Sequence, residues 1–289
     1  MSRTIGSGGL SRARVGGLGL LMGAAIACIA VAAPAPTSQT SGADLAKLKA
    51  VVSGEQRSAA HKARDKYRHP VETLAFFGIR PNMTVVELWP FGGWYTEIIA
   101  PYVKGHGTYY AAAMDPSSND REDKEYNAEL KKLLDARPDL YGEVKWSVLA
   151  KGKYDLAPPG SADLVVTFRN IHNWVWAGDE KEVFAAAFRA LKPGGILGVE
   201  EHRSNDPNAK PKRGEAYVGE EYAIGLIQSV GFKLAGRSNI NNNPKDTKDY
   251  PKGVWTLPPS YAEGDKDRAK YAAIGESDRF TLKFVKPAS

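Results

Sequence analysis

Cysteine is almost missing from this sequence of 289 residues, which holds only Cys28. Outside the N-terminal segment that carries it, disulfides, thiolate nucleophiles and cysteine metal sites are therefore excluded. No long internal run is apolar enough to span a membrane. Lysine and arginine are scattered without an arginine-rich run, so nucleic-acid binding has little support despite a formal net charge of +6. The remaining composition, 43% hydrophobic, is enough to bury the core of one globular domain.

The start of the chain has its own pattern. Arg3, Arg12 and Arg14 precede an uncharged segment that ends at residue 33 and is rich in Gly, Ala, Leu and Ile. A basic start followed by an apolar stretch and small residues is typical of a secretory signal peptide. We therefore predict a signal peptide over residues 1–33 and a periplasmic or secreted mature protein with no stable membrane association. An uncleaved anchor is the alternative, because this segment is just long enough to cross a bilayer.

The next segment separates this start from the main domain. Residues 34–43 are rich in Pro, Ser, Thr and Gly, as in linkers, and the charged stretch that follows is compatible with helix. We predict a linker and N-terminal helical appendage over residues 34–66. The rest of the chain, residues 67–289, is predicted to form one domain.

Short apolar runs alternate with amphipathic segments throughout that domain. Alternating β and α units predict an α/β fold, with a mainly parallel sheet covered by helices on both faces. A binding site is then expected at the carboxyl ends of the strands. Strands are predicted at 84–88, 107–113, 143–149, 162–168, 196–200, 233–237 and 280–285, and the main helices at 94–102, 121–136, 179–191 and 219–230.

Polar side chains and glycines directly follow four of these strands, and such residues are the expected lining of a binding crevice. The first strand leads to Glu87 and a Pro/Gly turn. The second ends at Asp115, the fourth at the string beginning Arg169-Asn170, and the fifth at Glu200-Glu201-His202. The polar segment 240–261 holds Trp255 and is expected to form a flap over this crevice.

At these positions the chain resembles the class I S-adenosylmethionine-dependent methyltransferases. The resemblance rests on the acid-ended strand Val85-Val86-Glu87 with its turn, on Asp115, and on Leu191-Lys192-Pro193-Gly194-Gly195 before the fifth strand. More narrowly, the chain is similar to an exported subgroup of predicted methyltransferases. The strings shared with that subgroup are Trp-Pro-x-Gly-Gly-Trp-Tyr-Thr, Phe-Arg-Asn-x-His-Asn-Trp and Glu-His-Arg, and the likeness covers residues 67–287.

This resemblance implies a Rossmann-like methyltransferase fold, a seven-stranded, mostly parallel sheet with helices on both faces and an antiparallel last strand. It implies S-adenosylmethionine as cofactor and methyl transfer to a small-molecule acceptor. Asp115 would accept hydrogen bonds from the ribose, and Asn170 would lie near the methyl group. The methionine part would contact Glu87 and the turn residues Trp89, Phe91, Gly92 and Gly93.

Candidate catalytic residues follow from the chemistry. Methyl transfer is a displacement in which positioning supplies most of the catalysis, and a base is needed only if the nucleophile loses a proton. His172 is the first candidate base and Glu201 the second, and Arg169 would line the site. We assign no metal. His69, His172 and His202 could bind one together with Glu201, but their spacing does not favour it, and structural histidines remain an alternative.

Phe91 departs from the pattern of the family. The three glycine positions of the family's turn correspond here to Trp89, Phe91 and Gly93. Glycine at such positions permits positive φ and close approach of a ligand. We therefore expect Phe91 to weaken or abolish cofactor binding. The alternative function is a non-catalytic exported ligand-binding protein that kept the fold and lost the cofactor. A nicotinamide-dependent dehydrogenase is disfavoured, because Gly-x-Gly-x-x-Gly is absent after Glu87.

Overall fold

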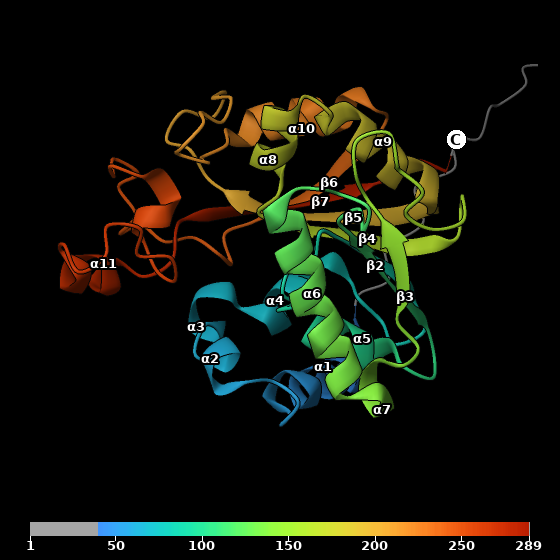
Figure 1. Cartoon of the computed structure of the whole chain (residues 1–289). Coiled ribbons are helices and arrows are strands. Elements are labelled where there is room, and N and C mark those ends of the chain that lie inside the picture. The colour runs from blue at the N-terminus through green and yellow to red at the C-terminus, as the bar shows by residue number, and fades with distance from the viewer. Residues whose placement is uncertain (1–39, 289) are drawn as a thin grey trace, which may run out of the picture. The chain divides into compact units, whose positions relative to one another are not determined.

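The computed structural model describes residues 40–288 of the chain (Figure 1). The predicted signal peptide and the start of the predicted linker therefore lie outside the described residues. Among the residues described, no helix has the length and apolar character needed to cross a membrane.

A seven-stranded sheet in the order β3-β2-β1-β4-β5-β7-β6 forms the centre of the fold. Only β7 runs against its two neighbours in this sheet, and the other strands are parallel to one another. The predicted fold class, including the antiparallel last strand, is confirmed. The strands are β1 Thr84–Leu88, β2 Thr108–Ala113, β3 Lys145–Val148, β4 Ala162–Phe168, β5 Leu191–His202, β6 Lys233–Ser238 and β7 Arg279–Val285.

Helices cover both faces of the sheet (Figure 1). Alternate residues of β1 show the division, since Val85 packs with α1, α4 and α5, whereas Val86 packs with α8, α9 and α10. The helices are α1 Gly42–Ser53, α2 Ala59–Lys62, α3 Asp65–Arg68, α4 Pro70–Phe77, α5 Thr96–Val103, α6 Arg121–Ala136, α7 Pro138–Tyr141, α8 Ile171–Ala177, α9 Glu180–Ala190, α10 Glu220–Ser229 and α11 Arg268–Ile274, with a 3-10 turn η1 at Gly253–Thr256.

Local sequence explains where several helices begin and end. Asp120 precedes α6, and its carboxylate accepts hydrogen bonds from two backbone N–H groups of the first turn. Pro70 opens α4, where its missing N–H costs nothing, and Gly78 ends the helix at a φ of 82°. In α1, Leu48 is fully buried in the core shared with α5. The predicted N-terminal helical segment therefore packs on the main domain.

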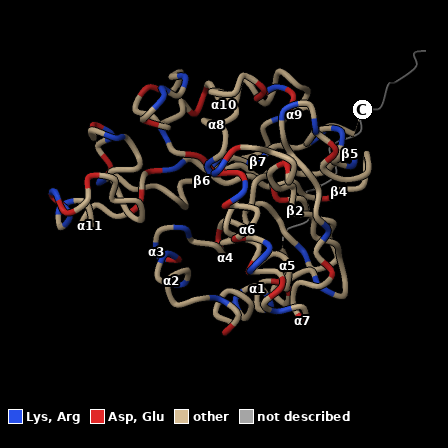
Figure 2. Tube along the Cα trace, viewed as in Figure 1, with Lys and Arg blue, Asp and Glu red and all other residues tan. Residues whose placement is uncertain are grey.

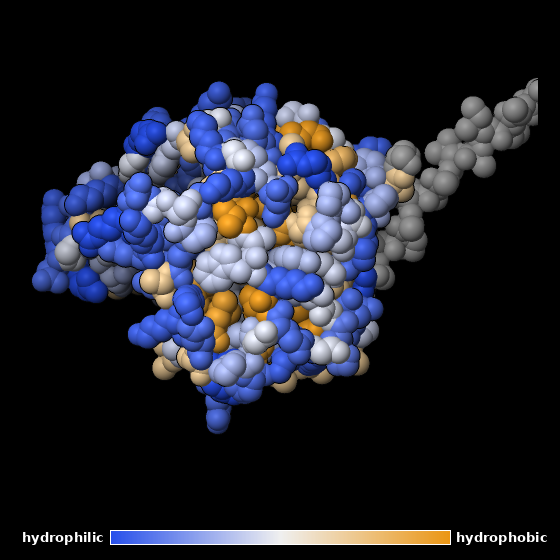
Figure 3. All heavy atoms as spheres, turned by 45° about the vertical axis from the view of Figure 1, so that its right-hand side comes forward, coloured by the Kyte–Doolittle hydropathy of each residue, from blue (hydrophilic) through white to orange (hydrophobic). Residues whose placement is uncertain are grey.

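Charges of both signs are interspersed along the chain (Figure 2). Hydrophilic residues cover most of the face in Figure 3, with separate hydrophobic patches between them. The functional region is instead marked by buried polar side chains. Many of these gather at the carboxyl ends of β1, β4 and β5 and at the start of β7.

Candidate functional site

The strand order reverses between β1 and β4, and ligands of open α/β sheets bind outside such a switch point. Asn170 lies there, buried, and donates from Nδ2 to the backbone oxygen of Leu88 at 3.0 Å and to Thr167 at 3.2 Å. Its Oδ1 is buried and has no hydrogen-bond partner within the described part of the chain. An unpaired buried acceptor is costly, so a donor from a ligand would be favourable at this point.

The turn after β1 keeps the backbone of a glycine turn without most of its glycines. Trp89 has a φ of 48°, Phe91 of 49° and Gly93 of 83°. All three lie in the left-handed region, at the positions where the resembled family has glycine. A non-glycine residue in that region costs on the order of 1–3 kcal/mol. The backbone is therefore suited to a close ligand, while two of its side chains are aromatic.

Those aromatic side chains fill the space outside β1 and β2. The ring of Phe91 lies 4.6 Å from that of Tyr126 in α6 and 6.2 Å from that of Trp89, centre to centre. Trp89 also donates from Nε1 to the backbone oxygen of Leu149 at 2.8 Å. The hollow left between these residues has no room for a water molecule. Ligand pockets usually hold about 300–1,000 Å³, so a nucleoside cofactor needs Phe91 to move.

The two glycines of the turn face α6. A Cβ on Gly93 would lie 2.3 Å from a methyl carbon of Leu133, and one on Gly92 would lie 3.0 Å from a carboxylate oxygen of Glu129. Here the glycines allow a helix to pack closely against the turn. Any contact of these two residues with a cofactor remains a prediction.

Glu87 points to the α5 side of the sheet. It is 3% exposed, and its Oε2 accepts hydrogen bonds from the hydroxyls of Tyr109 and Thr96. Burial raises the pKa of Glu87 to about 7, although both hydroxyls favour the charged form. In this arrangement the carboxylate ties β1 to β2 and to the start of α5.

Asp115 lies at the end of β2, where the resemblance places a ribose acceptor. Its side chain is 18% exposed and forms an ion pair with Lys153 at 2.6 Å. Hydrogen bonds from Lys153 and Ser117 lower the pKa of Asp115 to about 2. The group is therefore an ionised acceptor at neutral pH, and Lys153 is its present partner.

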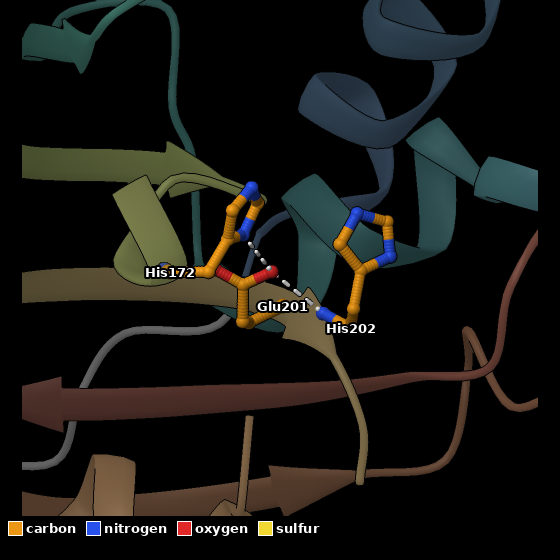
Figure 4. Close-up of side chains that lie close together, drawn as sticks. All are labelled: His172, Glu201 and His202. Atoms are coloured by element: carbon orange, nitrogen blue, oxygen red, sulfur yellow. Dashed lines mark hydrogen bonds and ion pairs between the residues drawn. The ribbon is translucent and has the colours of Figure 1, made fainter. Parts of the chain in front are cut away.

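His172, Glu201 and His202 come together at the ends of β4 and β5 (Figure 4). Nδ1 of His172 lies 3.2 Å from Oε1 of Glu201, and an ionised carboxylate can only accept, so Nδ1 carries the hydrogen. In the neutral ring that carries its hydrogen on Nδ1, Nε2 has a lone pair. His202 bonds Ser277 through Nδ1 at 2.6 Å. The sequence-predicted base and its acidic neighbour thus form a dyad with one basic nitrogen available.

Glu201 also contacts the first turn of α8. Its Oε2 accepts from the backbone N–H of Ile171 at 2.7 Å and from that of His172 at 3.4 Å, so it caps the start of α8. The same side chain fixes the helix and orients the imidazole. Trp176 and Trp255 border His172, at 5.1 and 6.1 Å between ring centres. The segment predicted to form a flap therefore reaches His172 through Trp255.

The same three residues could geometrically surround a cation, since one possible ligand atom from each lies within 4.8 Å of the others. The electrostatic surroundings oppose this. Burial lowers the pKa of His202 well below its usual value, and the nearby guanidiniums of Arg279 and Arg169 lower it further. The positive charges of Arg279 and Arg169 would repel a divalent ion at this place. We therefore assign no metal to this cluster.

Arg169 pairs with Glu200, with Nη1 at 3.0 Å from Oε1. Its backbone has a φ of 63°, and its N–H donates to the backbone oxygen of Glu200 at 2.7 Å. The network around it includes residues that sequence reasoning did not select. Glu200 stood in the strand-end string that marked Glu201, whereas Arg68, Glu276 and Arg279 gave no local signal because they are far apart in the chain.

The strand order with one reversed strand defines the Rossmann-like methyltransferase fold. No family model and no curated protein matches the chain. Among solved structures it is similar to an S-adenosylmethionine-dependent methyltransferase from Aquifex aeolicus, with 17% identity and a TM-score of 0.50 over 84% of this chain and 98% of that one. It is also similar to the [4+2]-cyclase SpnF, with 16% identity and a TM-score of 0.54 over 85% and 94%. These likenesses establish the fold, and a fold can host different reactions.

The described residues match S-adenosylmethionine in part. The left-handed turn, the ionised Asp115 and the unpaired Oδ1 of Asn170 suit a nucleoside ligand. The side chain of Phe91 packs on Tyr126 and leaves no room for a ligand beside the turn. The polar groups therefore fit the cofactor, and the volume does not while Phe91 rests on Tyr126.

Proposed function

We propose that this chain binds S-adenosylmethionine at the switch point and transfers its methyl group to a small-molecule acceptor. The observation that carries the proposal is the turn after β1, with left-handed backbone at residues 89, 91 and 93 beside the unpaired Oδ1 of Asn170. The similarity of the fold to a methyltransferase of known structure supports it. So does the His172–Glu201 dyad, which could accept a proton from an acceptor group.

In this proposal the cofactor, when bound, supplies an electrophilic methyl group. The residues of this chain position the two partners. Asp115 accepts from the ribose hydroxyls, and Asn170 accepts at the boundary between cofactor and acceptor. His172 takes a proton at Nε2 when the attacking group must lose one, while Glu201 holds the ring and stabilises its charge. Trp176 and Trp255 help to exclude water from this part of the crevice.

We further propose that the protein acts outside the cytoplasm, in the periplasm or after secretion. This rests on the basic and then apolar composition of residues 1–33. Expression with the natural N-terminus followed by mass determination tests it. A product that begins near residue 34 in the exported fraction is the expected result, and a full-length product retained in the cell would contradict it.

A second candidate function is a ligand-binding protein that kept this fold and lost the cofactor. The observation that favours it is the closed hollow between Phe91, Trp89 and Tyr126. Its ligand would then occupy the part of the crevice near His172 and Trp255, away from the turn.

Calorimetric titration with S-adenosylmethionine and S-adenosylhomocysteine tests the first candidate. We expect both ligands to bind with micromolar dissociation constants, since a bound ligand offsets the cost of moving Phe91. The absence of binding heat for both, in protein shown to be folded, would overturn the proposal and favour the second candidate.

A further inference from the structure

Four arginines meet near the crevice from distant parts of the chain. Arg64 precedes α3 and Arg68 ends it, Arg169 follows β4, and Arg279 opens β7. We call these four residues the arginine cluster. The carboxylates in direct contact with them are those of Glu200 and Glu276.

Glu276 serves three of the guanidiniums. It accepts from Nε of Arg64 and from Nε of Arg68, the latter at 3.1 Å, and it also pairs with Arg279. A carboxylate holds one negative charge, so this group is positive by two. Although Glu276 accepts hydrogen bonds from all three guanidiniums, it cancels the charge of only one of them.

Glu200 is likewise shared. Its Oε1 lies 3.0 Å from Arg169 and 3.3 Å from Arg279, so Arg279 bridges the two carboxylates. The hydroxyl of Tyr95 donates to the other oxygen of Glu200 and adds no charge. Taken together, four guanidiniums face two carboxylates, which leaves an excess of two positive charges.

This excess is shielded from water. The side chains of Arg279, Arg68 and Arg169 are 1%, 6% and 16% exposed. Buried charges are normally paired, because taking them out of water is costly. Crowding has the expected effect, since burial and the neighbouring guanidinium of Arg169 both lower the pKa of Arg68 well below its usual value. Nearby, Glu201 contacts His172 and three backbone N–H groups, and within the described residues no ion pair joins it to an arginine of the cluster.

Donors remain free on two members of the cluster. Within the part of the chain that the structure describes, side-chain hydrogen bonds engage only Nε of Arg68 and only Nη1 of Arg169. Their other guanidinium nitrogens are absent from the buried unpaired atoms of the described residues, so they reach solvent. A guanidinium with free N–H groups is the preferred partner for the paired oxygens of carboxylates and phosphates.

We propose that the arginine cluster binds an oxyanion, the carboxylate or phosphate group of a small-molecule ligand. The cluster lies beside His202, whose ring is 5.6 Å from that of His172 in the His172–Glu201 dyad. Identifying this ligand as the methyl acceptor rests on the proposed function. The oxyanion site itself does not depend on methyl transfer.

Phosphate affinity tests this site. Inorganic phosphate is titrated into the chain by calorimetry, with chloride at matched ionic strength as the reference. We expect saturable binding of phosphate by the wild type and a loss of affinity of at least about tenfold in Arg68→Gln, because two charge-assisted donors are removed. Arg121→Gln, an 88% exposed side chain in α6, is the control and should bind as the wild type does.

Arg68→Lys guards against misfolding of the first variant. It keeps the positive charge beside Glu276 but loses the planar set of guanidinium donors that can bind two oxygens at once. We therefore expect a folded protein with weaker phosphate binding. Wild-type protein that binds phosphate no better than chloride would overturn the inference. So would a folded Arg68→Gln or Arg68→Lys protein with unchanged affinity.

A final arm separates the two sources of such an oxyanion. Phosphate binding that persists with saturating S-adenosylhomocysteine assigns the site to the acceptor, whereas competition assigns it to the carboxylate of the cofactor. Either result supports an oxyanion site. Phosphate binding by a protein that binds no S-adenosyl ligand would keep this inference while the proposed function fails.

Discussion

At the scale of single residues, Phe91 combines a strained backbone with an aromatic contact to Tyr126. Replacing it by glycine removes the strain and enlarges the hollow at the turn. We predict that Phe91→Gly binds S-adenosylhomocysteine at least about tenfold more tightly than the wild type, because the ligand no longer has to displace a packed ring. Calorimetry under identical conditions measures the difference.

The control for this variant is Phe188→Ala. Phe188 lies in α9, away from the turn, and packs on Phe232. Removing the Phe188 ring should therefore leave the affinity for S-adenosylhomocysteine unchanged. Equal affinities in Phe91→Gly and in the wild type would show that Phe91 does not obstruct the site.

Glu87 gives a prediction about pH. Its pKa is about 7 in the folded protein and near 4.5 when unfolded, so the folded state binds more protons between these values. Stability should therefore fall as the pH rises from 4.5 to 7 and be constant above, by at most about 3 kcal/mol for this group. We predict that Glu87→Gln removes this part of the pH dependence and is more stable than the wild type at pH 8.

Denaturant unfolding at pH 5 and at pH 8 measures this effect. Glu125→Gln is the control, because that carboxylate is 55% exposed and pairs with Arg121 four residues away. If Glu87→Gln and the wild type lose the same stability between the two pH values, Glu87 is charged in the folded state and the structural argument fails.

At the scale of elements, the contact between the β1–α5 turn and α6 depends on Gly93. Gly93 and Gly105 both have positive φ, 83° and 74°, but only at Gly93 would a Cβ meet a neighbour, Leu133. We predict that Gly105→Ala costs about 1 kcal/mol of stability, from backbone strain alone. Gly93→Ala should cost more, by about 1–3 kcal/mol, since it also overpacks the turn.

The free energy of unfolding, measured in denaturant, compares the two variants. Adding Leu133→Ala to Gly93→Ala should recover part of the loss by making room for the methyl group. Similar costs at Gly93 and Gly105 would mean that α6 moves away from the turn without penalty.

Elements with strong sequence patterns were predicted well. The predicted bounds of β1, β4 and α6 agree with the structure, because apolar runs and the cap at Asp120 are local signals. The helix α8 was not predicted. Its first turn depends on the carboxylate of Glu201, about thirty residues further along the chain, and no local pattern shows that contact.

The candidate site likewise contains residues that the sequence predicts and residues that only the structure reveals. Arg169, His172 and Glu201 were predicted to lie together because they follow neighbouring parallel strands, and the structure brings them together. The ion pair of Arg68 with Glu276 joins residues that are 208 positions apart in the chain, so only the folded chain reveals it. The roles of these residues in binding and catalysis remain predictions.

At the scale of the whole molecule, the segment between β6 and β7 joins distant parts of the crevice. Asp246 in this segment accepts hydrogen bonds from the hydroxyl of Tyr217 at 3.0 Å and from the N–H of Asp278 at 2.8 Å. All three groups are buried. The contact holds the segment that carries Trp255 against the segment between β5 and α10.

We therefore predict that Tyr217→Phe destabilises the protein by about 1–3 kcal/mol, since Asp246 stays buried with a donor removed. Its melting temperature should fall by about 2–4 °C for each kcal/mol. Tyr222→Phe is the control, because among the described residues the hydroxyl of Tyr222 has no hydrogen-bond partner. Equal melting temperatures for the two variants would contradict the role given to Tyr217.

The central claim is that a nucleoside cofactor binds at the switch point once Phe91 moves. A crystal structure of the chain grown with S-adenosylhomocysteine tests it most directly. We predict ligand density beside Asn170 and Asp115, with the ring of Phe91 turned away from Tyr126. Crystals grown at saturating ligand in which Phe91 still packs on Tyr126, with no ligand at the turn, would contradict the account.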